Sequence, residues 1–269
     1  IFVRHGITNE LVKIKITAVS SKIAHADVIE VLTAAPSRVS APCQYAGKCG
    51  GCDFQHIDLL TQRKLKAEII KEQFMRIGKI DLPSLGFNLE VIEVEPSDGL
   101  HWRTRMEFVV SPNGKIGFFG ARSNEVVEIS QCLIADERMN VSELAARTWK
   151  SDARVEVAVS STSEVSVMRS GRSISGPTQI VEQVGGNSFK ISPEAFWQSH
   201  KSAPVTLVKA ALAQLGVKSN DHVCDLYSGV GLFAAAILKE LGEQGFITLI
   251  ESDKSAVADS RKVFLNKSN

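Results

Sequence analysis

Three cysteines crowded into one short segment constrain the fold of this chain more than any other feature of its sequence. Cys43, Cys49 and Cys52 follow the spacing Cys-x5-Cys-Gly-Gly-Cys. This spacing lets one loop wrap three thiolates around a metal centre, and the paired glycines allow the tight turn that brings backbone N–H groups toward sulfur. The segment therefore predicts a metal site rather than a set of ordinary core cysteines.

A four-thiolate site needs one further cysteine. Cys132 follows a predicted hairpin, whereas Cys224 lies inside an apolar strand, where a reduced cysteine is commonly a small buried residue. We therefore prefer Cys132 as the fourth ligand and predict that Cys224 belongs to the core. Disulfides are disfavoured because the chain opens without the features of a secretion signal. Four thiolates suit structural zinc or an iron-sulfur cluster, and the spacing alone leaves both open.

Length and composition indicate a multidomain globular protein. The 269 residues exceed the usual size of one domain, and 44% hydrophobic with 23% charged residues is near the globular average. No apolar run reaches the roughly 18 residues of a membrane-spanning helix. We therefore expect a cytoplasmic monomer without membrane contact. The net charge of +1 gives no global argument for nucleic-acid binding, although residues 63–79 are locally basic.

Hydrophobic periodicity divides the chain into three predicted parts. Residues 1–40 alternate apolar and polar positions as half-buried strands do, and a linker with Pro and Ser follows. Residues 41–190 contain the cysteine segment and a β-rich stretch. Residues 191–269 alternate helix with strand, which is the βαβ order of an open, largely parallel sheet.

Several elements within these parts have clear local signals. A helix is predicted from the N-cap Asp58 to just before Gly78, and a hairpin at Asn113-Gly114. Ser192-Pro193 predicts the start of a helical turn. The next helix is predicted to end before Gly216 and to bury one face, made of Val208, Ala211, Leu212 and Leu215.

A glycine loop between two predicted strands indicates a nucleotide-type cofactor. Asp225 stands at the end of one strand, and Gly229 and Gly231 open the following helix, where a ligand can approach bare backbone. Glu251 ends the next strand, where a carboxylate can accept hydrogen bonds from both ribose hydroxyls. NAD is the rival ligand. S-adenosylmethionine is preferred because the third small residue falls at Ala234 and an acidic residue before the glycines is more typical of methyltransferases.

Together these motifs resemble those of the bacterial RNA uracil-5-methyltransferases. The similar stretches span nearly the whole chain: Cys43-x5-Cys-Gly-Gly-Cys, Phe54-Gln55-His56, Cys132-Leu133-Ile134, Phe196-Trp197-Gln198 and Asp225-Leu226-Tyr227-x-Gly-x-Gly. The resemblance implies an α/β multidomain protein. Residues 1–40 would be an incomplete OB-like TRAM domain, 41–190 a central domain with a [4Fe-4S] cluster, and 191–269 the N-terminal half of a Rossmann-like class I methyltransferase domain. In the family the helix after the cysteine loop packs with the methyltransferase domain, so residues 55–86 are left unassigned.

The resemblance also implies roles for individual residues. The cluster ligands would be Cys43, Cys49, Cys52 and Cys132, which favours iron over zinc. Contacts to S-adenosylmethionine would come from Gln198, Tyr227 and Glu251, beside the loop residues Asp225, Gly229 and Gly231. The sequence departs from the family pattern at Leu232 and His200, where Asn is common, which affects local contacts only.

The family's chemistry also bears on the ends of the chain. A cysteine thiolate adds to C6 of uracil, the resulting enolate attacks the sulfonium methyl group, and a base removes the C5 proton. Four cysteines are assigned to the cluster and Cys224 is predicted to be buried, so no catalytic residue is assigned. Both termini look like cuts, and we expect the catalytic cysteine, the base and a further cofactor-binding Asp beyond Asn269. The chain alone is therefore expected to be inactive.

The expected partner is RNA, with 23S ribosomal RNA favoured because cluster-bearing members resemble that branch. The β unit and the basic residues 63–79 would bind phosphates, and Arg103 and Arg105 beside Trp102 are candidate contacts. Two alternatives stay open: a tRNA uridine C5 methyltransferase, and an iron-sulfur RNA-binding module without catalysis. An NAD-dependent oxidoreductase with an iron-sulfur site is less favoured.

Overall fold

The fold is taken from a computed structural model that describes residues 1–193 and 195–265. The chain divides into two compact units, and each is described by itself. The first comprises Ile1–Glu93 with Phe118–Val127, and the second comprises Val94–Gly117 with Glu128–Asn269. The three-part division at residues 40 and 190 stays a prediction. Among the described residues, no helix is long and apolar enough to cross a membrane.

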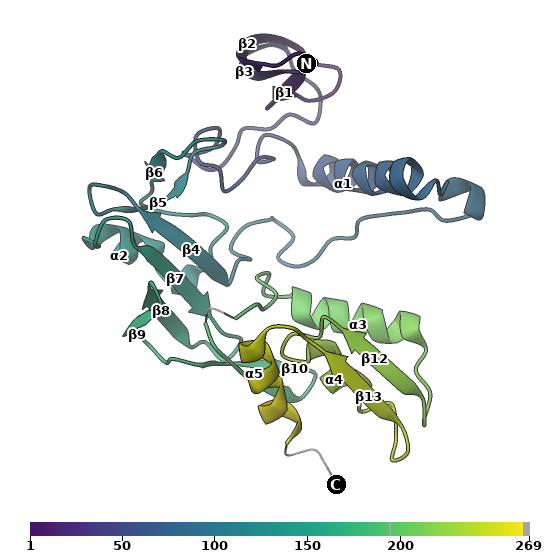
Figure 1. Ribbon diagram of the computed structural model, residues 1–269. Coiled ribbons are helices and arrows are strands. Elements are labelled where there is room, and N and C mark those ends of the chain that lie inside the picture. The colour runs from purple at the N-terminus through teal and green to yellow at the C-terminus, as the bar shows by residue number, and fades with distance from the viewer. Residues whose placement is uncertain (194, 266–269) are drawn as a thin grey trace. The chain divides into compact units, whose positions relative to one another are not determined.

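The first unit opens with a three-stranded sheet, as the alternating pattern before residue 40 predicts. Its strands are β1 (Phe2–Arg4), β2 (Leu11–Val19) and β3 (Ala24–Thr33), in the order β1-β3-β2 (Figure 1). β1 runs parallel to β3, and β2 runs antiparallel to it with three register shifts. Such irregularities bend and twist a strand locally.

A buried ion pair closes this sheet onto the linker that follows it. The Glu10 carboxylate accepts hydrogen bonds from the backbone N–H groups of Ile7 and Ala35, at 2.9 and 3.1 Å, and from the Arg38 guanidinium. The Arg38 hydrogen bond is the main reason why the pKa of Glu10 falls to about 2. The carboxylate therefore stays ionised and ties three parts of the unit together.

Replacing Glu10 by glutamine is expected to lower the free energy of unfolding at pH 7 by about 1–3 kcal/mol, because hydrogen bonds to a buried carboxylate are lost. In the wild-type chain this stabilisation is present above the unfolded pKa of 4.5 and is lost as the pH falls toward about 2. Urea unfolding at several pH values measures both effects. The control is Glu30→Gln, because the exposed Glu30–Lys13 pair should contribute little. Equal losses in the two variants would contradict the prediction.

The cysteine segment leads into a long helix whose start agrees with the sequence. Asp58 accepts the Thr61 N–H at 2.8 Å and caps α1 (Leu59–Gln73), which continues into a π-helical turn, η1 (Phe74–Gly78). A short 3-10 turn, η2 (Pro83–Leu85), follows. Of the apolar positions Ala67, Ile70, Phe74 and Ile77 along this helix, only Ala67 is buried. The helix therefore leaves most of these apolar side chains exposed.

An antiparallel sheet forms the centre of the chain and confirms the predicted hairpin. The strand order is β6-β5-β4-β7-β8-β9, and the division between the units passes through β5 and β6. The Asn113-Gly114 turn lies between β4 and β5, with Gly114 in the left-handed region at φ 74°. The bounds are β4 (Arg105–Val110), β5 (Ile116–Phe119), β6 (Val126–Glu128), β7 (Arg154–Val159), β8 (Val165–Arg169) and β9 (Arg172–Ser175). The 3-10 turn η3 (Glu137–Met139) and α2 (Val141–Ala146) precede β7 and bury Met139 and Leu144.

The C-terminal part confirms the predicted alternation of helix and strand. A hairpin of β10 (Ile180–Val184) and β11 (Asn187–Ile191) precedes α3 (Ala203–Leu215). Then β12 (His222–Leu226) and β13 (Phe246–Ile250) pair in parallel across α4 (Leu232–Ile237), and α5 (Lys254–Phe264) follows. One buried cluster joins Phe189, Trp197, Val208, Val230 and Val263. This cluster packs the hairpin and the three helices into one core.

Three expectations in this part need correction or restriction. Cys224 is exposed, although its apolar strand predicts burial. It shares one face of the β12–β13 pair with Leu226 and Ile250, and no described element covers that face well enough to bury them. On α3, Val208 is buried but Leu215 is exposed. The helical turn predicted at Ser192-Pro193 falls partly on residue 194, outside the described residues.

Candidate cofactor site and cysteine loop

The loop after β12 has the backbone conformation that the glycine pattern predicts. Tyr227, Gly229 and Gly231 have positive φ angles of 60°, 54° and 86°. A Cβ atom on Gly231 would lie 2.7 Å from the Phe264 ring, so both its conformation and its packing require glycine. The Ser228 N–H donates to the Ile250 carbonyl at 3.2 Å, which fastens the loop to the end of β13.

Glu251 joins the two parallel strands at their carboxyl edge. Its carboxylate accepts the Gly229 N–H at 2.8 Å, and it also accepts the N–H groups of Ser252 and Asp253, at 2.6 and 2.8 Å. The hydrogen bonds from Asp253 and Gly229 hold the pKa of this carboxyl below its usual value. Glu251 is thus ionised, fixed beside the glycine loop and still able to accept hydrogen bonds from a ligand.

The other predicted cofactor residues lie around this edge or next to its core. Asp225 stands at the end of β12, where burial raises its pKa, and its Oδ2 atom is buried without a hydrogen-bond partner among the described residues. Tyr227 is 90% exposed. Gln198 follows Trp197, whose ring lies 5.3 Å from that of Phe189 in the core that also contains Val230. Contact of these residues with a cofactor stays a prediction.

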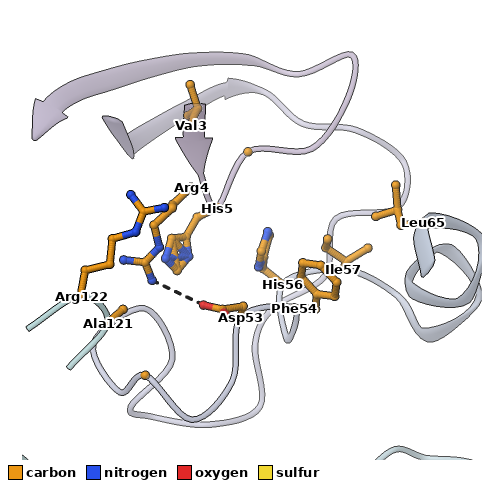
Figure 2. Close-up of a pocket in the computed structure, with 12 residues that line it drawn as sticks. Val3, Arg4, His5, Asp53, Phe54, His56, Ile57, Leu65, Ala121 and Arg122 are labelled. Atoms are coloured by element: carbon orange, nitrogen blue, oxygen red, sulfur yellow. Dashed lines mark ion pairs between the residues drawn. The ribbon is translucent and has the colours of Figure 1, made fainter. Parts of the chain in front are cut away.

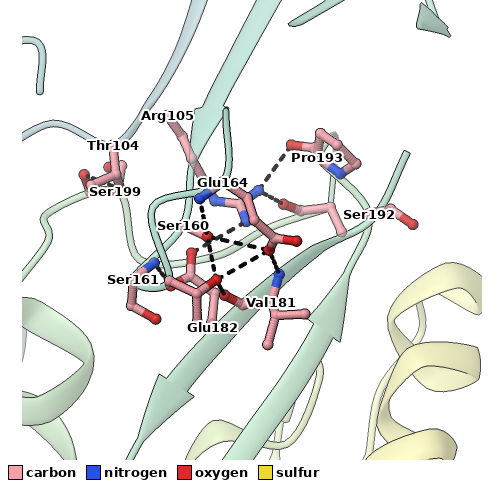
Figure 3. Close-up of polar contacts among 12 residues, drawn as sticks. Thr104, Arg105, Ser160, Ser161, Glu164, Val181, Glu182, Ser192, Pro193 and Ser199 are labelled. Carbon is pink, nitrogen blue, oxygen red and sulfur yellow. Dashed lines mark hydrogen bonds and ion pairs between the residues drawn. The ribbon is translucent and has the colours of Figure 1, made fainter. Parts of the chain in front are cut away.

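A polar network anchors the segment that carries Gln198, and sequence reasoning missed it. Thr104 donates both its N–H and its hydroxyl to the Ser199 carbonyl, at 2.7 and 3.1 Å. The Lys201 N–H donates to the Trp102 carbonyl at 2.9 Å, and the Trp102 ring stacks on His200 at 5.3 Å. The segment just before β4 therefore fixes residues 199–201 on one side of Gln198, and Figure 3 shows Thr104 beside Ser199.

Arg105 fixes the other side of Gln198 and is not a surface contact for RNA. Its side chain is only 11% exposed, and its guanidinium donates to the carbonyls of Pro193 and Ala195 at 2.9 and 3.1 Å. Burial lowers its pKa to about 10. The nearby Glu182 carboxyl is buried, lies 3.8 Å away, and accepts the Ser161 N–H (Figure 3). The expectation that Arg105 faces RNA is wrong because the strand turns this side chain into the core.

Arg103 also differs from an open surface cation. Its guanidinium lies 5.9 Å from the centre of the Trp102 ring and donates to the Arg105 carbonyl. These contacts make it a partly buried packing residue. Arg103 pairs with His200 and Ala135, which lie far away in the sequence. Hydrophobic periodicity does not reveal such pairing, so the sequence could not separate Arg103 from an RNA contact.

The cysteine loop is held by backbone hydrogen bonds within the first unit. The Gly50 N–H donates to the Phe119 carbonyl at 2.9 Å, and a Cβ atom on Gly50 would lie 2.7 Å from that oxygen. The Gly51 N–H points at the Cys49 sulfur at 3.4 Å. Gly51 thus has the role that the spacing predicts, because it directs an N–H at a thiol, whereas Gly50 permits a close approach to the Phe119 carbonyl.

Cys49 lies close enough to the other two thiols of this loop for them to affect its pKa. Burial raises the pKa of Cys49, and the neighbouring Cys52 and Cys43 raise it further. Cys132 lies in the second unit and is half-buried. Among the described residues, no group of three or more His, Cys, Asp or Glu side chains is arranged to hold a metal ion. The four-cysteine ligand set therefore stays a prediction.

Comparison with known proteins places the chain among RNA methyltransferases. No family model matches it. It is 33% and 34% identical to proteins of Streptomyces coelicolor and Streptomyces avermitilis that carry the name uncharacterized RNA methyltransferase, over 97% of the chain in both cases. A Corynebacterium glutamicum protein of the same name is 30% identical over 90% of the chain. The chain spans 65%, 69% and 63% of the lengths of these three relatives.

A solved structure has the same fold. It is a Pyrococcus abyssi tRNA (uracil-54, C5)-methyltransferase in complex with S-adenosyl-L-homocysteine. The TM-score is 0.66 at 19% sequence identity, and the match covers 99% of this chain and 72% of the other. At this identity the likeness concerns the mixed α/β fold.

Proposed function

The chain belongs to the RNA methyltransferase family of its Streptomyces relatives, and from this premise we propose that it transfers a methyl group from S-adenosylmethionine to C5 of a uridine in RNA. The observation that carries the proposal is the Gly229–Glu251 hydrogen bond at the carboxyl edge of β12 and β13. It sets bare backbone and a carboxylate side by side, which is what the ribose and methionine parts of this cofactor require. The fold neighbour's complex with S-adenosyl-L-homocysteine supports the same cofactor.

Each residue at this edge has a definite task in the proposal. Glu251 accepts hydrogen bonds from the two ribose hydroxyls, because its oxygens are ionised and oriented by three backbone N–H groups. Gly229 and Gly231 keep side chains away from the ligand. Tyr227 offers an exposed ring for stacking, and Gln198 contacts the cofactor from the segment that β4 anchors. The residues present therefore fit the cofactor.

The proposed reaction proceeds through covalent addition to the base. A cysteine thiolate forms a bond to C6 of uracil, and the electrons that arrive at C5 form a bond to the sulfonium methyl group, so that S-adenosylhomocysteine leaves. A base then takes the C5 proton, and the S–C6 bond breaks to release the methylated uridine. We assign no catalytic residue within this chain. Because Cys224 is exposed, burial no longer argues against Cys224 as the nucleophile, and a substitution at this position tests that role directly.

We propose that Cys43, Cys49, Cys52 and Cys132 hold an iron-sulfur cluster. The donor set fits: the Gly51 N–H points at the Cys49 sulfur, the neighbouring Cys52 and Cys43 raise the pKa of Cys49, and metal binding favours the thiolate form. When bound, such a cluster supplies thiolate–iron bonds that fix the loop. It has no part in the methyl-transfer steps.

Methyl transfer can be tested directly with tritium-labelled S-adenosylmethionine. The full-length gene product should label C5 of a uridine in unmodified 23S ribosomal RNA, which we propose as the substrate, and Cys224→Ala should leave the rate unchanged. Labelling of unmodified tRNA but not of 23S ribosomal RNA would show that the substrate is tRNA, the class of RNA named for the fold neighbour. RNA binding without cofactor binding would favour the non-catalytic iron-sulfur module. Loss of transfer in Cys224→Ala would identify that residue as the nucleophile.

Glu251→Ala is expected to weaken S-adenosylmethionine binding by roughly 1–3 kcal/mol, because the ribose hydroxyls lose their acceptor and the Gly229 N–H loses its partner. Isothermal calorimetry on the full-length product measures this loss. Glu243→Ala is the matched control, since Glu243 is an exposed residue of the segment between α4 and β13. Tight NAD binding without S-adenosylmethionine binding would contradict the proposal, as would equal affinities for the two variants.

A further inference from the structure

A cleft in the first unit gathers cationic and aromatic side chains that the proposed cofactor site does not use. Its volume is about 470 Å³, within the range typical of small-ligand sites. The side chains that matter come from three segments far apart in the sequence: Arg4 and His5 at the end of β1, Asp53, Phe54 and His56 from the cysteine segment, and Arg122 after β5. Figure 2 shows Arg4, His5 and Arg122 on one side of the cleft and His56 with Phe54 on the other.

The cations on the rim are only partly neutralised. Arg4 lies 3.5 Å from Asp53 and 4.0 Å from Asp27, both long distances for an ion pair. Arg122 is exposed, and its guanidinium contacts a ring nitrogen of His25 at 3.0 Å. The two guanidinium groups therefore keep donors available for an anion, and arginine is well suited to phosphate oxygens.

The rings inside the cleft are placed to contact a flat group. The imidazoles of His5 and His56 lie 5.6 Å apart and tilted at 44°, and His56 Nε2 is buried without a hydrogen-bond partner among the described residues. Burial lowers the pKa of both rings, so both are neutral near pH 7. His5 and Arg122 both have left-handed backbones, at φ 63° and 54°, which non-glycine residues adopt rarely and often at functional sites.

We propose that this cleft binds one unstacked nucleotide of a single RNA strand, with its phosphate on Arg4 and Arg122 and its base against His5, His56 and Phe54. Stacking on aromatic rings and contact of arginine with the backbone are the means by which proteins hold single-stranded RNA. The orphaned His56 Nε2 gives the base a hydrogen-bond partner. This inference rests on the proposed function, in which RNA is the substrate. It adds a site at which the protein holds one nucleotide of that RNA.

The lining distinguishes this cleft from the proposed metal site. Among the described residues, no cysteine lines it. A smaller cavity of about 180 Å³, which includes Cys52 and Arg38 in its lining, shares His5, Asp53 and His56 with it. His5 and His56 thus line both cavities, and Gly50 and Asp53 of the cysteine segment also line the open cleft, so RNA bound there would cover that side of the loop.

The test measures binding of a fluorescent oligouridylate of about ten nucleotides by anisotropy over a range of salt concentrations. Arg122→Asn should reduce the slope of log affinity against log salt by about 0.7, the share of one phosphate contact on a single strand. His5→Asn should weaken binding about 5- to 100-fold with the slope unchanged, because it removes a stacking ring. Asparagine tolerates the left-handed backbone at both positions, and thermal melts verify folding.

The matched control is Arg172→Ala, which removes an exposed arginine from β9 and should change neither affinity nor slope. A 4-thiouridine probe should cross-link to the peptide that contains Phe54 and His56. Wild-type affinity in both cleft variants, or cross-links that lie only elsewhere, would overturn the inference. If polyglutamate competed as strongly as RNA, the cleft would bind anions without recognising a nucleotide, and this result would also overturn the inference.

S-adenosylmethionine binding is measured on the same variants and should be unchanged. This arm separates the two proposals. If the cleft variants lose RNA binding while no variant binds the cofactor, methyl transfer fails and the nucleotide site stands. If the cofactor binds normally while RNA binding ignores the cleft variants, the nucleotide site fails and methyl transfer stands.

Discussion

Cys49→Ala is expected to abolish iron binding. The wild-type protein, purified without oxygen, should be brown and should hold about four irons, as a [4Fe-4S] cluster requires. Cys49 is the central thiol of its loop: burial and two neighbouring thiols raise its pKa, and the Gly51 N–H points at its sulfur. Its removal takes away one of four covalent bonds to the cluster. Iron content and visible absorption measure the result.

The matched variants separate ligands from the remaining cysteine. Cys43→Ala, Cys52→Ala and Cys132→Ala should also lose the cluster, whereas Cys224→Ala should keep iron and colour because Cys224 lies on β12 and is not among the proposed ligands. Thiolate ligands must lose their protons, so iron uptake should release protons and weaken at low pH. Stoichiometric zinc without iron would contradict the prediction, and so would an intact cluster in Cys132→Ala.

Elements with local signals could be predicted from the sequence. The N-cap at Asp58 and the hairpin at Asn113-Gly114 depend on residues close in sequence, and the structure has both. The two strands predicted before and after the glycine loop are also present, as β12 and β13, because each is a short apolar run bounded by turn residues. The Gly229–Glu251 contact follows from the parallel pairing of those strands, since their carboxyl ends must meet at one edge.

Burial depends on the rest of the chain and could not be predicted in the same way. Arg105 is charged but buried, because two backbone carbonyls from residues about ninety positions away in the sequence receive its N–H groups. Cys224 lies in an apolar strand but is exposed. The pattern of a strand does not indicate whether both of its faces will be covered by other elements. Side chains such as His5, His56 and Arg122 share a cleft that no periodicity relates. Sequence patterns therefore indicate elements better than they indicate which long-range contacts bury a charge.

Arg105→Met is expected to lower the free energy of unfolding at pH 7 by about 3–5 kcal/mol, the usual effect of removing one member of a buried ion pair. Two consequences add. The carbonyls of Pro193 and Ala195 lose their donors, and the Glu182 carboxylate, 6% exposed, loses the nearest positive charge. Urea unfolding measures the change. Arg154→Met is the control, because the Arg154–Glu107 pair is about half exposed and should contribute little.

The pH dependence tests the cause of that loss. Burial raises the pKa of Glu182 above its usual 4.5, so folding is favoured by protonation, and stability falls as the pH rises from 4.5 through the folded pKa. Without Arg105 the folded pKa rises further. The gap between wild type and Arg105→Met should therefore be smallest near pH 4.5 and grow toward pH 7. In an Arg105→Met, Glu182→Gln double variant, glutamine still accepts the Ser161 N–H but carries no charge, so this growth should disappear. A gap of constant size from pH 4.5 to 7 would mean that the two lost carbonyl hydrogen bonds, rather than an uncompensated carboxylate, account for the instability.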